Sequence, residues 1–193
     1  MKNVRVLDCT LRDGGRIIDC AFEDQEIKEI AQRLEEANID IIEVGFIRDG
    51  RKVHYEGNST FFTDVNQIKP FIKRDNPNAI YTAFIDYGMC DIDNLGEYDG
   101  SSIDAIRFGF TKKNYDEEKE EVLRWIRIIK EKGYKLFIQG VNSLNYSDRE
   151  LLEIVDMVNE VHPYSFGIVD TYGAMYMDCL LYTSPSPRDT ERS

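Results

Sequence analysis

An arginine and an aspartate stand side by side near the start of the chain, in the segment LDCTLRDGGR. These residues, Arg12 and Asp13, follow a strand-like run and precede two glycines, which give the backbone freedom to turn. A carboxylate at the end of a strand is a good ligand for a hard divalent cation. The neighbouring guanidinium stays protonated and can stabilise a developing enolate or carboxylate. Together they suggest a metal that chelates a 2-oxo acid, although a lone R-D-G sequence more often forms an ordinary salt bridge.

Glu43 is a third charged residue that points to chemistry, because it lies inside the apolar run IIEVGF. An unpaired carboxylate is costly in such surroundings, so Glu43 requires a partner. Arg12, on the strand expected to lie next to it, is the natural one. This ion pair would have a structural role and would also orient the arginine.

The elements that position these side chains can be read from the period of the apolar residues, which changes repeatedly along the chain. Segment 39–44 is almost continuously apolar, as in a strand buried on both faces. Ser147 and Glu150 have the spacing of a capping box, which marks the start of a helix. Strands are predicted at 4–9, 39–44, 79–85, 105–110, 135–139 and 165–169, and helices at 23–37, 65–73, 116–132 and 147–162.

Strands separated by helices are expected to be parallel, which allows a doubly wound sheet or a (β/α)8 barrel. Neither G-x-G-x-x-G nor G-x-x-x-x-G-K-[ST] is present, so a nucleotide-binding fold lacks support. A full barrel needs about 250 residues and eight strands, so the prediction is an incomplete α/β TIM barrel of about six βα units, without strands seven and eight. Polar residues follow several different strands, as in a barrel with its site at their carboxyl ends: Arg12, Asp13, 45–48, Asp86, Asn142 and Asp170.

The formal charge of −12 disfavours partners with phosphate backbones or anionic lipid surfaces, so neither nucleic acid nor a membrane is expected. No apolar run approaches the roughly 20 residues that span a bilayer, and the chain opens without a signal-peptide pattern. The four cysteines show no C-x-x-C spacing and are expected to be reduced thiols. These features predict a cytoplasmic protein.

The C-terminal segment does not continue the alternating pattern. Residues 179–189 read CLLYTSPSPRD, and Pro185 and Pro187 are incompatible with a helix there. The segment matches one reading frame of a transposon-derived sequencing adapter. The prediction is a barrel domain over residues 1–178 and a non-native, disordered tail at 179–193, with an ordinary disordered C-terminus as the alternative.

Three segments resemble those of a known family: DCTLRDGG after the first predicted strand, IEVGF at the second and VDTYGAM at the sixth. They are similar to the DRE-TIM metallolyases, a group that includes 4-hydroxy-2-oxovalerate aldolases, hydroxymethylglutaryl-CoA lyases, and isopropylmalate and homocitrate synthases. The resemblance covers roughly residues 4–178. It implies that Asp13 is a metal ligand, that Arg12 stabilises an enolate and that Glu43 holds the arginine. The implied cofactor is a divalent cation: Mn²⁺, Mg²⁺ or Zn²⁺.

This resemblance also implies a lyase that makes or breaks a carbon–carbon bond next to a metal-bound enolate. VDTYGAM is closest to the aldolase branch, so Asp170 and Thr171 are expected to line the site, with Asn142 and Tyr87 as weaker polar candidates. Asp170 could instead cap the following helix. We therefore expect a metal-dependent aldolase that acts on a 2-oxo acid or its aldol adduct. The alternatives are a Claisen synthase that uses an acyl-CoA and a barrel relative without catalytic activity.

The chain departs from the family pattern in two places. The family's H-x-H metal ligands on the seventh strand are absent, since the two histidines, His54 and His162, lie in no such sequence. Both are predicted to be exposed or structural, because a lone histidine is not a metal site. Arg16 stands where the aldolase branch often has a histidine, and it is expected to bind a substrate carboxylate instead. The full-length protein is expected to be a homo-oligomer, and the 193-residue chain alone to be inactive.

Overall fold

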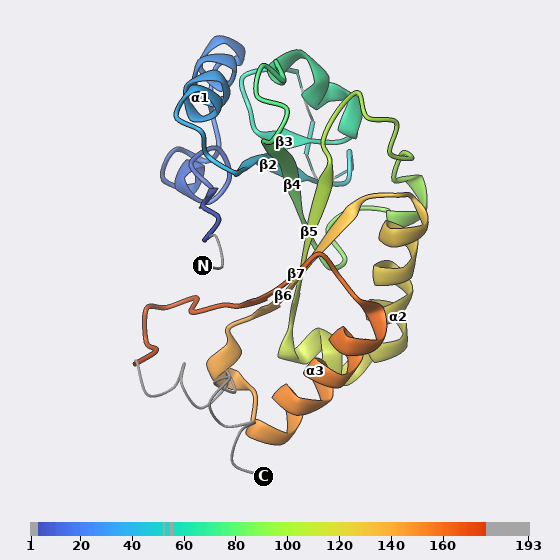
Figure 1. Ribbon diagram of the computed structural model, residues 1–193. Coiled ribbons are helices and arrows are strands. Elements are labelled where there is room, and N and C mark those ends of the chain that lie inside the picture. Colours follow the sequence, from blue (N-terminus) through green and yellow to red (C-terminus); the bar gives the residue numbers. More distant parts are fainter. Residues whose placement is uncertain (1–3, 52, 55, 177–193) are drawn as a thin grey trace.

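A curved parallel sheet forms the centre of the structure, a computed structural model that describes residues 4–51, 53–54 and 56–176. Helices cover its convex side, and the concave side is open (Figure 1). The strand order is β1-β2-β4-β5-β6-β7, with β3 paired to β2, and every pair is parallel. This half-barrel of about six βα units confirms the predicted incomplete α/β TIM barrel.

The strands are β1 (Leu7–Asp8), β2 (Ile41–Ile47), β3 (Phe61–Phe62), β4 (Ile80–Asp86), β5 (Ala105–Thr111), β6 (Lys135–Val141) and β7 (Ser165–Ile168). The helices are α1 (Asp24–Glu36), α2 (Lys112–Glu131) and α3 (Asp148–Val161), with 3-10 helices η1 (Gly14–Ile18), η2 (Val65–Phe71), η3 (Ile92–Asn94) and η4 (Ser143–Asn145).

Capping residues set where the two long C-terminal helices begin. The side chains of Ser147 and Glu150 each accept a hydrogen bond from the other's backbone N–H, which confirms the predicted capping box of α3. α2 begins at Lys112 rather than at residue 116. The reason is that Thr111 and Asn114 form a second capping box, which the apolar period alone does not reveal.

The two faces of the sheet differ, because alternate residues of a strand point to opposite sides. In β2, Ile42 and Val44 belong to the main core between sheet and helices, so Ile41 and Glu43 face the concave side. Residues on this side form layers, as in the interior of a barrel. From the amino to the carboxyl ends of the strands, these are an apolar layer of Leu7, Ile41, Ile80, Ala105 and Phe137, a polar layer of Glu43, Thr82, Arg107 and Gln139, and an aromatic layer of Phe46, Phe61 and Phe84 with Cys20.

The short strand β3 is absent from the sequence prediction, and its pairing with β2 depends on Gly45. A Cβ on Gly45 would lie 2.2 Å from the carbonyl O of Thr60, and the φ of this glycine is +150°. That same carbonyl accepts a hydrogen bond from the N–H of Phe46 at 2.8 Å. The register of β2 against β4 shifts between Glu43 and Phe46, so Phe46 joins Glu43 on the concave side.

Tyr87 lies on the helix-covered side of the sheet, so its predicted place at the mouth of the barrel is wrong. Its hydroxyl donates to Oε2 of Glu118 at 2.5 Å, and its ring packs on Trp125 with centroids 5.1 Å apart. Burial, followed by the hydrogen bond to Glu118, raises the pKa of Tyr87 above its usual range. A residue just after a strand can face either the mouth or the outer helices, and the sequence pattern did not decide between them.

Two further predictions concern the C-terminal tail and the absence of membrane-spanning segments. The tail predicted at 179–193, and the domain boundary at 178, lie outside the described residues. Across the ranges that the structure describes, the helices are all too short or too polar to cross a membrane.

Candidate active site

A tight turn after β1 holds the arginine and the aspartate in place. The backbone N–H groups of Arg12, Asp13 and Gly14 all donate to the carbonyl O of Cys9, at 3.0, 2.8 and 3.1 Å. Because three donors converge on one acceptor, the backbone reverses direction just where the strand ends. The two charged side chains therefore start from a well-defined backbone.

Packing, rather than backbone freedom, explains the second of the two glycines in this turn. Positive φ angles occur at several glycines of the described chain, but Gly14 and Gly15 are not among them. A Cβ on Gly15 would lie 2.8 Å from the ring of Phe22 and 3.3 Å from Sγ of Cys20. Gly15 is thus required because a ring and a sulfur press against its backbone, and the expectation that both glycines relax the turn is wrong.

Glu43 is fully buried, and both of its carboxylate oxygens are paired. Oε1 accepts a hydrogen bond from Nε of Arg12, and Oε2 accepts one from Nη1 of Arg107. The predicted ion pair between Arg12 and Glu43 is therefore present. Since two buried guanidiniums share one carboxylate, the group carries an excess of positive charge inside the half-barrel.

Arg107 is the member of this group that the sequence reasoning missed. It lies in β5, in the sequence AIRFGFT, and the whole residue is only 9% exposed. A charged residue inside an otherwise apolar strand is the same signal that singled out Glu43, so the same argument would have found it. Nη1 of Arg107 also donates to Sγ of Cys9 at 3.5 Å, which ties β5 to the end of β1.

The buried charges shift the pKa values of Arg12 and Cys9 upward. Burial alone lowers the pKa of Arg12, but the charge and hydrogen bond of Glu43 raise it to a net value above the ordinary one. Burial, and then the negative charge of Glu43, raise the pKa of the Cys9 thiol. The guanidinium therefore stays charged, and the thiol stays protonated and is a poor nucleophile near neutral pH.

Asp13 lies at the exposed edge of this group, with 60% of its side chain accessible. Its Oδ1 accepts hydrogen bonds from Nη1 of Arg12 at 2.9 Å and from Nε of Arg16 at 3.1 Å. The structure thus brings together the predicted metal ligand, the predicted enolate stabiliser and the predicted carboxylate binder. Their roles stay predictions, but their side chains meet.

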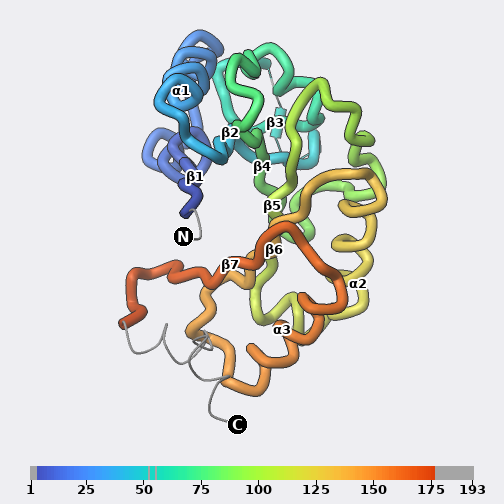
Figure 2. Tube along the Cα trace, in the orientation of Figure 1, coloured from blue at the N-terminus to red at the C-terminus, as the bar shows by residue number. Residues whose placement is uncertain are grey.

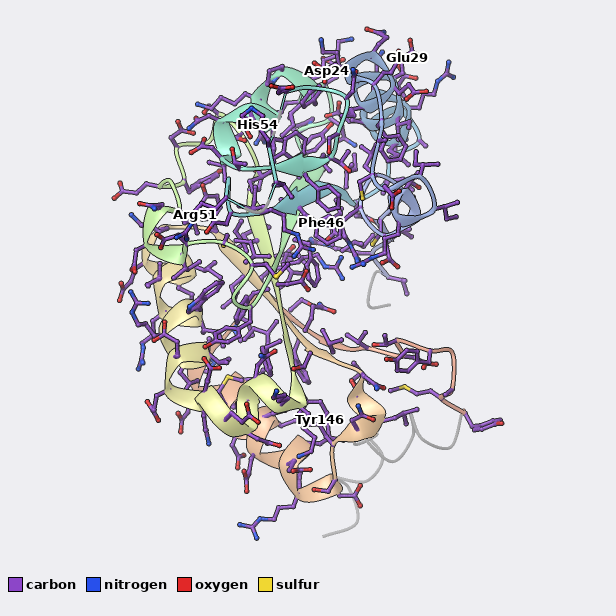
Figure 3. The ribbon with its side chains drawn as sticks, turned by 180° about the vertical axis from the view of Figure 1, so that it is seen from behind. Asp24, Glu29, Phe46, Arg51, His54 and Tyr146 are labelled. Atoms are coloured by element: carbon purple, nitrogen blue, oxygen red, sulfur yellow. The ribbon has the colours of Figure 1, made fainter. Side chains whose placement is uncertain are left out.

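Aromatic rings form a base on which the guanidiniums gather. The guanidinium carbon of Arg12 lies 4.7 Å from the ring centroid of Phe84 and 5.7 Å from that of Phe46. Arg48, directly after β2, lies 4.6 Å from Phe46, and Arg107 lies 5.5 Å from Phe84. Figure 3 shows Phe46 with nitrogen-bearing side chains close beside it.

Asn142 and Thr171 contact each other, and Asp170 binds its own turn, but none of the three contacts the arginine group in the described chain. The hydroxyl of Thr171 accepts a hydrogen bond from the backbone N–H of Asn142 at 3.0 Å. Asp170 accepts from the N–H groups of Ala174 and Met175 at 2.8 and 2.9 Å, and these bonds lower its pKa. Asp170 thus binds the backbone of the turn that follows it, and no helix follows it within the described residues, so the alternative role of a helix cap stays a prediction. Because β1 and β7 are the opposite edges of the open sheet, the two groups remain apart in the described chain (Figure 2).

A family model described as HMGL-like matches residues 3–180. The chain belongs to the HMGL-like family. The resemblance drawn from the three sequence motifs is therefore confirmed. The contacts among Arg12, Asp13 and Glu43 join the first two of those motifs in this HMGL-like chain, whereas the third lies at the opposite edge of the sheet.

Curated relatives of the HMGL-like chain include two kinds of synthase. Homocitrate synthase AksA of Methanocaldococcus jannaschii is 24% identical over 177 residues, which cover 90% of this chain and 42% of the relative. Probable 2-isopropylmalate synthases of Methanosarcina mazei and Methanosarcina acetivorans are 25% and 26% identical, over 90% of this chain and 33% of their own length. The chain thus spans less than half the length of these relatives.

The family resemblance implies a divalent metal, but the described residues of the HMGL-like chain do not complete a site for one. Within these residues, no group of three or more His, Cys, Asp or Glu side chains converges as metal ligands. Asp13 is therefore a single candidate ligand, and its Oδ1 already accepts from two guanidiniums. As predicted, His54 is exposed, where it pairs with Glu56, and His162 ends α3.

Proposed function

We propose that the full-length protein forms carbon–carbon bonds by a Claisen condensation, in which an acyl-CoA adds to a 2-oxo acid. The names of the relatives, homocitrate synthase and 2-isopropylmalate synthase, favour this reaction over the aldol cleavage expected from the sequence motifs. The observation that carries the proposal is the fixed guanidinium of Arg12, held by buried Glu43 at the carboxyl end of β1.

The geometry of Arg12 suits a reaction in which charge develops on oxygen. Nε is held by Glu43 and Nη1 by Asp13, so the guanidinium is fixed from two sides at the carboxyl end of β1. A donor fixed before the reaction begins stabilises an enolate or alkoxide without further reorganisation. Removal of one such donor typically lowers kcat by about 10²–10³-fold.

We further propose that the full-length protein depends on Mn²⁺, Mg²⁺ or Zn²⁺, with Asp13 as one ligand. Treatment of the full-length protein with a chelator should then abolish activity, and each ion added back should be tested for recovery. Retention of full activity after the metal content has fallen to background would remove this part of the proposal.

An aldolase acting on a 2-oxo acid adduct is the second candidate, and the sequence VDTYGAM favours it. Both reactions place charge on an oxygen next to the reacting carbon, so both can use the same arginine. They differ in their products. A condensation releases free CoA, whereas aldol cleavage releases a 2-oxo acid such as pyruvate.

The decisive experiment assays the full-length protein for CoA release from an acyl-CoA with a panel of 2-oxo acids, and in parallel for pyruvate release from aldol adducts. The variant Arg12→Lys should lose about 10²–10³-fold in kcat. The reason is that the single ammonium group of lysine cannot reproduce the planar guanidinium, which Glu43 and Asp13 bind through two different nitrogens. The matched control is Arg124→Lys, a partly exposed residue of α2 that pairs with Asp93 and Glu121, which should retain wild-type activity. A folded, metal-loaded protein that catalyses neither reaction would instead favour a barrel relative without catalytic activity.

A further inference from the structure

Arg48 has a buried donor that no protein group uses. The residue follows β2 directly and is only 8% exposed. Its Nη2 forms an ion pair with Oδ2 of Asp86 at 2.8 Å, while its Nη1 is enclosed and has no hydrogen-bond partner among the described residues. A buried N–H of a charged group is costly to leave unpaired, so such a group indicates a missing acceptor.

Three guanidiniums surround the same phenyl ring. The guanidinium carbons of Arg48, Arg16 and Arg12 lie 4.6, 5.2 and 5.7 Å from the ring centroid of Phe46. The guanidiniums of Arg48 and Arg16 are therefore at most about 10 Å apart, a span that one small molecule can bridge. The thiol of Cys20 is close to the same three arginines. Burial raises its pKa and is the dominant effect, while the positive charges of Arg16, Arg48 and Arg12 each lower it.

The local charge balance is positive, against the strongly acidic chain as a whole. In the described chain the four arginines of the site, counting Arg107, form their ion pairs with three carboxylates: Asp13, Glu43 and Asp86. The formal charge of the whole chain is −12. A cluster of guanidiniums with too few carboxylates, on an apolar base, is suited to take up an oxyanion.

We propose that Arg48 and Arg16 form an oxyanion subsite around Phe46, which binds a carboxylate or phosphate group of a small anionic molecule. The inference rests on the proposed function in one respect: it assigns this group to the substrate of the same site, as a second anionic end remote from the reacting carbon. Asp86 keeps Arg48 in place through Nη2, and the unpaired Nη1 supplies the donor to the anion. Arg16, with 58% of its side chain exposed, closes over the anion from the turn after β1.

The test measures anion binding, which does not depend on catalysis. Inorganic phosphate, succinate and acetate are titrated into the 193-residue chain, and binding is followed by calorimetry and by the side-chain ¹⁵N signals of its arginines. Saturable binding of phosphate or succinate is expected. Arg48→Gln and Arg16→Gln should each weaken it by about tenfold or more, while the control Arg124→Gln, in α2, should leave it unchanged. Preference for phosphate or for succinate identifies the group that the subsite takes.

Because Arg48 also pairs with Asp86, the single variant could unfold for structural reasons. The double variant Arg48→Gln with Asp86→Asn removes both charges and keeps a neutral hydrogen-bonding pair, so it should fold and still fail to bind. The absence of saturable binding to the wild-type chain, or wild-type affinity in a folded Arg48 variant, would overturn the subsite. Either result would leave the activity assays of the full-length protein untouched, so the two proposals fail separately.

Discussion

The carboxylate of Glu43, fully buried in β2, accepts a hydrogen bond from the guanidinium of Arg12, which lies 31 positions earlier in the chain. Arg107 of β5 holds the other oxygen of the same carboxylate. The arginine at the end of β1 is thus anchored through one buried acid to a strand that is three places away in the sheet. Its position cannot change without exposing or unpairing a buried charge.

Neutralising Glu43 should therefore destabilise the fold strongly. In Glu43→Gln the side chain keeps its shape, but two buried guanidiniums lose the carboxylate that they share. The free energy of unfolding should fall by about 3–5 kcal/mol, as for other broken buried ion pairs. Denaturant unfolding followed by circular dichroism measures it. The control Glu56→Gln removes an exposed pair with His54 and should cost less than about 1 kcal/mol. Equal effects of the two substitutions would contradict the role assigned to Glu43.

Arg107 and Glu43 should also show energetic coupling. A double-mutant cycle of Arg107→Met and Glu43→Gln should give a coupling energy of about 0.5–3 kcal/mol, because the two side chains are in direct contact. Pairing Glu43→Gln with Arg124→Met should give a coupling energy near zero, because Arg124 of α2 pairs with Asp93 and Glu121 instead. If both cycles are additive, the Arg107 contact is not part of the arrangement that holds Arg12.

The core of the site was predictable because it depends on short-range rules. A carboxylate within an apolar strand needs a cation, and the strand before it offered Arg12. Arg107 gave the same signal but was not used. Arg48 gave only the general signal of a polar residue after a strand, within the segment 45–48, and that signal does not predict its burial. Its burial depends on the register shift between Glu43 and Phe46, and that shift requires the close approach of Thr60 to Gly45.

The four central strands β2, β4, β5 and β6 were predictable because each is seven residues long and mostly apolar, whereas β3 was not. Two phenylalanines in a loop carry no periodic signal, and their pairing with β2 is a tertiary contact. The strand-end rule also placed Asn142 and Asp170 with Arg12. That rule holds within a closed barrel, but here β1 and β7 are opposite edges of an open sheet.

Gly15 provides a test of packing in the turn after β1. Gly15→Ala would place a Cβ 2.8 Å from the ring of Phe22, so the ring or the turn must shift. We expect a loss of about 1–3 kcal/mol in the free energy of unfolding, as for other overpacked sites. Gly14→Ala is the matched control, because the nearest heavy atom to its Cβ would be the Cys9 carbonyl at 3.8 Å. Similar stabilities for the two variants would show that Phe22 yields without cost.

The link between β5, α2 and α3 should make stability depend on pH in acid. The hydrogen bond from Lys112, followed by those from Ser147, lowers the pKa of Glu150 from 4.5 to about 2. A lowered folded-state pKa means that this contribution is fully present above about pH 4.5 and is lost as the pH falls towards 2.

Glu150→Gln keeps the cap on α3 but removes the charge, so its unfolding free energy should vary less with pH across this window. Lys112→Met removes the largest cause of the lowered pKa of Glu150. The unfolding free energy of this variant should therefore also vary less with pH across the same range, because ionising Glu150 stabilises its folded state less. Thermal unfolding of the wild-type protein and the two variants between pH 2 and 6 measures how steeply stability changes with pH. The wild-type dependence in both variants would mean that other carboxylates determine the loss of stability in acid.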